Sequence, residues 1–82
     1  MEAGHAAILT VKRAETGPGL IIRLYETGGE SHNCRLKLCR DIRRASTCTL
    51  AEEPLAPLES LGSRVTVPLV ANGLATVRVE VE

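Results

Sequence analysis

Short segments in which apolar and polar residues alternate make up most of this chain. In the clearest of them, residues 33–38, every second side chain is apolar. A period of two places successive side chains on opposite faces of a strand, so each segment predicts a strand with one buried face. Six strands are expected, at residues 7–12, 20–25, 33–38, 44–50, 65–69 and 75–81.

The alternation also predicts which residues share a face of each strand. In the first segment Ala7, Leu9 and Val11 fall on one face. In the fourth segment one face holds Ser46, Cys48 and Leu50. We expect these apolar sets to point toward the core, because a half-buried strand keeps its apolar face away from water.

Turn signals separate the segments, and helical spacing is weak throughout. The turns are Gly17-Pro18-Gly19, Gly28-Gly29 and Asn72-Gly73. Residues 50–61 have leucines near helical spacing, but Pro54 and Pro57 would break a helix, so we predict an ordered connection there. The pattern therefore predicts an all-β protein: a small, immunoglobulin-like antiparallel β-sandwich of about six strands in one domain, residues 1–82.

The last two strands leave two arrangements open. A two-residue Asn72-Gly73 turn would place charged residues of the final strand on the apolar face of the preceding one. Either a three-residue loop, 71–73, forms with Gly73 at positive φ, or the chain crosses from one sheet to the other. Pro68 cannot donate a backbone hydrogen bond, so it marks its strand as an edge.

Composition excludes several classes of function. The 82 residues carry ten basic and ten acidic side chains, and aromatic residues make up 1% of the chain, with Tyr25 alone. A zero net charge argues against a nucleic-acid partner, and one tyrosine cannot form a platform for stacking bases or sugar rings. No apolar run is long enough to span a membrane. Residues 1–7 do not resemble a signal peptide, and three cysteines do not suggest a secreted disulfide framework, so we expect a cytoplasmic protein.

A zinc site is the first chemical possibility. His32, Cys34, Cys39 and Cys48 lie close in the sequence, and a His/Cys₃ set can bind zinc. Their spacing is unlike that of a zinc knuckle, so we favour buried, inert thiols and assign no metal ligand. Cys34 and Cys48 are expected on the inward faces of neighbouring strands, where a disulfide would be possible but unexpected in a reducing compartment.

No catalytic or cofactor-binding constellation is present. A nucleophilic cysteine or serine needs a histidine base, but the histidines lie near the N-terminus, at His5, and at a loop edge, at His32. Gly17-Pro18-Gly19 lacks the following helix that a phosphate-binding loop requires. A basic cluster holds half of the positive charge: Arg35, Lys37, Arg40, Arg43 and Arg44. This cluster is either an anion or nucleic-acid site or a solvated strand face, and zero net charge favours the solvated face.

Arg23 occupies an unusual position. It lies between Ile22 and Leu24 in the most apolar segment, and its own face also carries Ile21 and Tyr25. That face is too apolar to be simply exposed to water. We therefore predict a structural role for Arg23, pairing with an acid inside the sandwich or at a contact with another domain.

Several stretches of the sequence resemble a known family. Residues 7–26 read AILTVKRAETGPGLIIRLYE, and they are similar to the C-terminal β-sandwich domain of glycoside hydrolase family 38, the α-mannosidases. There a strand ending in K-x-A-E-D/E-G precedes a strand ending in R-L-Y-E and then a glycine. Residues 49–55 resemble the family's "nLlEepL" stretch, and residues 76–79 its final T-x-R strand. Residues 70–73 depart from the Pro-Phe-Glu that the family often carries, and the cysteine-rich middle matches nothing specific.

The resemblance implies that this domain is non-catalytic. The family's aspartate nucleophile, acid/base carboxylate and zinc ion belong to an N-terminal catalytic domain, and none of those residues matches a position here. The expected partner is that catalytic domain of the parent glycosidase. The expected contact residues are Arg23, Tyr25 and Glu26, which would either touch the catalytic domain or set the geometry of the strand behind the contact. The alternatives are a free-standing immunoglobulin-like interaction or carbohydrate-binding module, and a small zinc domain.

Overall fold

The computed structural model describes residues 2–3, 6–15, 17, 19–49, 51 and 53–81, and these form nine β-strands. In chain order the strands are β1 (Glu2–Ala3), β2 (Ala6–Arg13), β3 (Leu20–Glu26), β4 (His32–Lys37), β5 (Ile42–Cys48), β6 (Pro54–Pro57), β7 (Ser60–Leu61), β8 (Arg64–Leu69) and β9 (Leu74–Val81). The described residues contain no helix, and hence none that could cross a bilayer.

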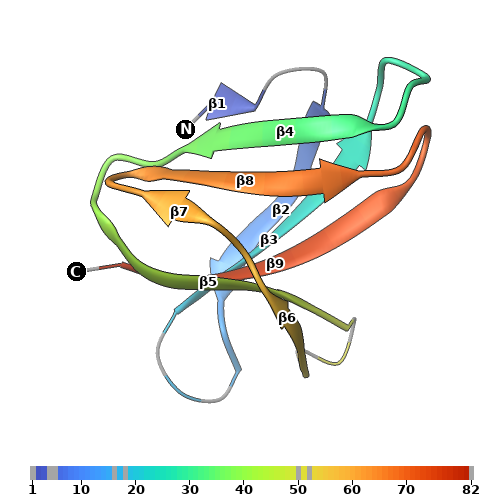
Figure 1. The fold of residues 1–82 in the computed structure, drawn as a ribbon. Helices are drawn as coiled ribbons and strands as arrows, with labels where there is room; N and C mark the ends of the chain where they lie inside the picture. The colour runs from blue at the N-terminus through green and yellow to red at the C-terminus, as the bar shows by residue number, and fades with distance from the viewer. Residues whose placement is uncertain are drawn as a thin grey trace.

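The strands form two antiparallel sheets that face each other (Figure 1). The four-stranded sheet has the order β1-β4-β8-β7, and the five-stranded sheet has the order β2-β3-β9-β5-β6. This arrangement confirms the predicted antiparallel β-sandwich, and each of the six predicted segments overlaps one of the longer strands, with ends that differ by at most two residues.

Aliphatic side chains from both sheets fill the space between them. The buried cluster consists of Ile22, Leu24, Cys34, Leu36, Leu38, Ala45, Val65, Val67, Leu69, Val77 and Val79. The only aromatic residue, Tyr25, is not among them. Aliphatic side chains on alternate positions of several strands are therefore enough to form a closed core.

A bulge in β2 makes one predicted face wrong. The pairing of β2 with β3 shifts between Ile8 and Thr10, so that Ala7 lies opposite Tyr25 whereas Val11 lies opposite Ile22. Directly paired residues point to the same side of a sheet, and Ile22 points into the core while Tyr25 points outward. Ala7 and Val11 are therefore on opposite faces, because one extra residue in the bulge reverses the alternation.

The face predicted for β5 is also wrong. Ala45 is the β5 residue in the core cluster, opposite Val79, whereas the neighbouring Ser46 is opposite Arg78 on the other face. Cys48 is buried but lies outside the core cluster. Because β4 and β5 belong to different sheets, Cys34 and Cys48 do not occupy neighbouring strands as expected. Leu50 lies outside the described residues.

The connection between β8 and β9 crosses from one sheet to the other, which is the second of the two arrangements left open. Asn72 has the positive φ, 55°, and the Gly73 N–H donates to the Val70 carbonyl at 2.8 Å. A Cβ on Gly73 would lie 3.0 Å from that carbonyl oxygen, so the position favours glycine for close approach rather than for its φ. We call residues 70–73 the β8–β9 arch.

The described part of the predicted connection at 50–61, residue 51 and residues 53–61, contains no helix, and residues 54–61 carry the chain from one sheet to the other (Figure 1). Within it, β6 adds to the edge of the five-stranded sheet and β7 to the edge of the four-stranded sheet. Prolines are tolerated in β6 because it is an edge strand. The prediction that Pro68 marks an edge strand is wrong, because β8 lies between β4 and β7. The proline is tolerated since β7 pairs only with Arg64 and Val65, and Pro68 lies beyond that short pairing.

Candidate functional site

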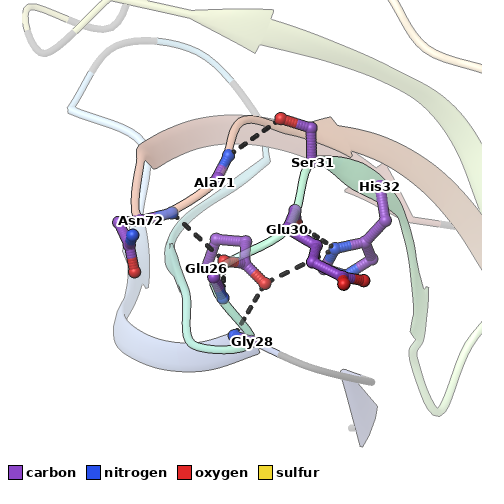
Figure 2. Close-up of polar contacts among 8 residues, drawn as sticks. Glu26, Gly28, Glu30, Ser31, His32, Ala71 and Asn72 are labelled. Carbon is purple, nitrogen blue, oxygen red and sulfur yellow. Dashed lines mark hydrogen bonds and ion pairs between the residues drawn. The ribbon is translucent and has the colours of Figure 1, made fainter.

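Glu26 is the centre of the densest polar cluster in the described part of the chain. It ends β3, its side chain is 0% exposed, and its carboxylate faces two loops (Figure 2). The backbone N–H groups of Gly28 and Gly29 each donate to it at 2.7 Å, and that of Asn72 donates at 3.1 Å. Glu26 therefore connects the turn after its own strand to the β8–β9 arch.

Two further hydrogen bonds strengthen this connection. The Ala71 N–H donates to Ser31 Oγ at 3.0 Å, and the Glu26 N–H donates to the Gly73 carbonyl at 2.9 Å. Residues 40 or more positions apart in the sequence are thus joined by side-chain and backbone hydrogen bonds. Loops joined in this way lose the freedom to move independently.

His32 forms the outer wall of the cluster. Its Nδ1 lies 3.5 Å from Glu26 Oε2 and donates a hydrogen bond to the Glu30 carbonyl at 2.9 Å. Glu26, Gly28, Glu30 and His32 line a hollow of about 340 Å³. The hollow therefore places the carboxylate of Glu26 beside the imidazole of His32.

The protonation of Glu26 follows from its contacts. Burial raises the pKa of the Glu26 carboxyl, but the N–H donors of Asn72, Gly28 and Gly29 and the nearby His32 lower it more, so the net pKa is below the ordinary value of 4.5. The group is ionised at neutral pH and its oxygens are occupied by backbone donors. It is therefore suited to hold the two loops in place and unsuited to act as a general acid, which needs a raised pKa.

Arg23 and Tyr25 lie on the outer face of the five-stranded sheet. Arg23 is half-buried between its cross-strand partners Thr10 and Thr76, on the face turned away from the core between the sheets. Its predicted structural role stays a prediction. Tyr25 lies between Ala7 and Leu74, and the exposed fractions of Tyr25 and Leu74 are 37% and 68%. We call Ala7, Tyr25 and Leu74 the apolar row.

The structure separates the three predicted contact residues into two groups. Arg23 and Tyr25 share the outer face, whereas Glu26 is fully buried and pairs with Ala6, which packs against the core. Glu26 can affect a contact on the outer face only through the geometry of β3 and the arch. The partners of Glu26 in the arch were missed, because the Asn72-Gly73 signal indicates a turn without indicating what that turn contacts.

The residues proposed as the zinc alternative are spread over the sandwich. Cys34 is buried in the core on β4, Cys39 is exposed after β4, and Cys48 is buried at the end of β5 in the other sheet. Within the described ranges, no three His, Cys, Asp or Glu side chains converge as a metal site.

Comparison with known proteins gives one family. Residues 5–81 match the model of the glycosyl hydrolases family 38 C-terminal beta sandwich domain. No curated protein and no solved structure matches the chain. The family match spans every strand from β2 to β9, including the Glu26 cluster and the apolar row.

Proposed function

Because the chain belongs to the family of C-terminal β-sandwich domains of glycosyl hydrolases family 38, we propose that it is the accessory domain of an α-mannosidase and packs on the catalytic part of that enzyme. The observation that carries this proposal is the family match over residues 5–81. In this proposal the catalytic part supplies the two carboxylates and the zinc ion, and the protein acts in the cytoplasm.

The state of Glu26 supports a non-catalytic role. Glycoside hydrolysis needs a carboxylic acid that is protonated at working pH, paired with a second carboxylate. The pKa of Glu26 is shifted in the opposite direction, and both of its oxygens accept backbone hydrogen bonds. In our proposal this cluster keeps the domain rigid, and hydrolysis takes place elsewhere.

The outer face of the five-stranded sheet is the surface that we propose for the contact. The apolar row runs across three adjacent strands there, with Arg23 in the next position along β3. Tyrosine and arginine are enriched at the energetic centres of interfaces. Glu26 supports this surface indirectly, because Leu74 directly follows Gly73, whose carbonyl accepts the Glu26 N–H.

The proposal is tested by purifying the protein from its natural source. We expect a family 38 catalytic domain in the same polypeptide or as a stoichiometric partner, and hydrolysis of an aryl α-mannoside by that assembly. The 82-residue chain alone should give no turnover. Absence of any such catalytic domain would refute the accessory role, and turnover by the chain alone would refute the non-catalytic role.

The contact surface is tested separately with two variants of the assembly. Tyr25→Ala combined with Leu74→Ala should weaken the contact at least tenfold, because it removes most of the exposed apolar area of the row. Leu61→Ala is the matched control: Leu61 is 86% exposed but belongs to the other sheet. An equal loss of affinity for the catalytic part in the double variant and in the control would contradict the proposed surface.

A further inference from the structure

Three cationic side chains lie together on the outer face of the four-stranded sheet. Arg35 and Lys37 occupy exposed positions of β4, where the alternate residues are buried. Arg64 begins β8 and is the cross-strand partner of Lys37, while Arg35 pairs with the next outward residue, Thr66. Arg64 therefore has Lys37 directly opposite and Arg35 on the diagonal, within reach of long side chains.

Two glutamates lie near this group, because Glu2 of β1 is the cross-strand partner of Lys37 and Glu59 lines the same hollow as the two arginines. None of the three side chains forms an ion pair with any residue that the structure describes. Arg44, which belongs to the same basic stretch of sequence, differs because Glu80 lies 2.8 Å from its Nε on the other sheet. Like charges placed opposite each other on a sheet repel, so an anion bound between them would lower their free energy.

The two arginines also border hollows on this face. The larger hollow is about 560 Å³ in volume and is lined by Arg35, Glu59, Ser60, Leu61, Arg64 and Thr66. The smaller is about 260 Å³, shares both arginines and adds Lys37. The volume of the larger hollow is that of a small-molecule site. The Thr66 hydroxyl supplies a neutral donor beside Arg35, its cross-strand partner.

We propose that Arg35 and Arg64, with Lys37 beside them, form a binding site for an oxyanion, namely a phosphate or sulfate group that is either free or carried by a sugar. Guanidinium groups bind such oxyanions with paired hydrogen bonds. The Glu59 carboxylate can accept hydrogen bonds from the hydroxyls of a sugar. No aromatic platform is needed, because the charge provides the attraction. The site lies on the opposite sheet from the proposed domain contact and does not depend on it.

The experiment is a titration of the ¹⁵N-labelled protein with sodium sulfate or sodium phosphate, followed by amide chemical shifts, against sodium chloride at equal ionic strength. Saturable shifts are expected at residues 35, 37, 60, 64 and 66. Arg35→Gln combined with Arg64→Gln should weaken binding at least tenfold. The matched control, Arg13→Gln combined with Arg43→Gln, removes two exposed arginines elsewhere and should leave binding within about twofold.

Two results would overturn the site: sulfate and phosphate shifts no larger than those with chloride, or unchanged binding in the Arg35/Arg64 variant. Arg35 and Arg64 are exposed, so their replacement should not unfold the protein. Unchanged amide shifts of core residues, such as Val77, would show that the variant is folded. A hexose 6-phosphate distinguishes the sources. Binding at least tenfold tighter than inorganic phosphate would support a sugar-borne group, and equal binding would support a free anion.

Discussion

The Glu26 cluster predicts that a single oxygen-to-nitrogen replacement will destabilise the whole domain. Glu26→Gln keeps the size of the side chain but changes one carboxylate oxygen to an NH₂ group. Oε1 accepts the N–H groups of Gly29 and Asn72, and Oε2 accepts that of Gly28. In either orientation the new NH₂ faces a backbone donor across the 2.7 Å of the original hydrogen bond. The better orientation turns the NH₂ toward Gly28, because only one donor then loses its acceptor.

The expected effect follows from that geometry. One charge-assisted hydrogen bond is lost, its backbone donor is turned toward the new NH₂ group, and the remaining bonds weaken because the acceptor is neutral. For a domain of this size we expect the melting temperature at pH 7 to fall by about 10–20 °C. Glu30→Gln is the control, since Glu30 lines the same hollow but is exposed and contributes its backbone carbonyl rather than its carboxylate. That variant should melt within about 2 °C of wild type.

The pH dependence provides a second test of the same group. The pKa of Glu26 is lower in the folded state than its ordinary value of 4.5, so folding favours the ionised form. This contribution is fully present above 4.5 and is lost as pH falls through the folded-state pKa. Melting followed by circular dichroism at several pH values should therefore show the wild-type advantage over Glu26→Gln at neutral pH and its decrease below 4.5. If Glu26→Gln had the same melting temperature as wild type at pH 7, or if the difference in melting temperature did not change with pH, the reasoning would be refuted.

Three further predictions concern the core, the arch and the cysteines. Leu24→Ala should lower the free energy of unfolding by about 2–5 kcal/mol in urea titrations, and Leu61→Ala by less than about 0.5 kcal/mol, because the first side chain is fully buried and the second is exposed; similar losses would contradict the assigned core. At Asn72, where φ is 55°, replacement by glycine should be nearly neutral and by alanine should cost about 1 kcal/mol in the same titrations; the reverse order would contradict the assigned φ. Cys39 should react with a thiol reagent in the native protein, and the two buried cysteines only in denaturant; three equally fast thiols would exclude the buried positions.

The strands could be predicted from the sequence because their signal is local. Alternation over six to eight residues and glycine-containing turns are read within one segment, and β3, β4, β8 and β9 follow that alternation. The bulge at Leu9 could not be predicted, since both Ile8 and Leu9 are apolar and either could have faced the core. The short β6 and β7 were missed because each gains its pairing from a neighbouring strand rather than from its own pattern.

The candidate site shows the same limit more strongly. Arg23 stands out because an arginine in an apolar strand is unusual, and Arg23, Tyr25 and Glu26 belong to the R-L-Y-E motif of the family resemblance; both signals are local. The role of Glu26 depends on Asn72, 46 residues further along the chain, and no pattern within β3 indicates that contact. Similarly, the basic stretch in the sequence includes Arg44, which the fold places beside Glu80, but omits Arg64, which the fold places beside Arg35 and Lys37.

The position of β9 has a consequence for how the protein is made. β9 is the last of the described strands in chain order, yet it lies in the middle of the five-stranded sheet and pairs with both β3 and β5. Until it emerges, β3 and β5 have no shared neighbour and the apolar faces of the nascent chain remain incompletely covered. Such late, non-local pairing slows folding, and the five-stranded sheet is completed only after β9 has been synthesised. A premature stop codon before residue 74 would therefore remove the strand on which the whole sheet depends, rather than trim an edge.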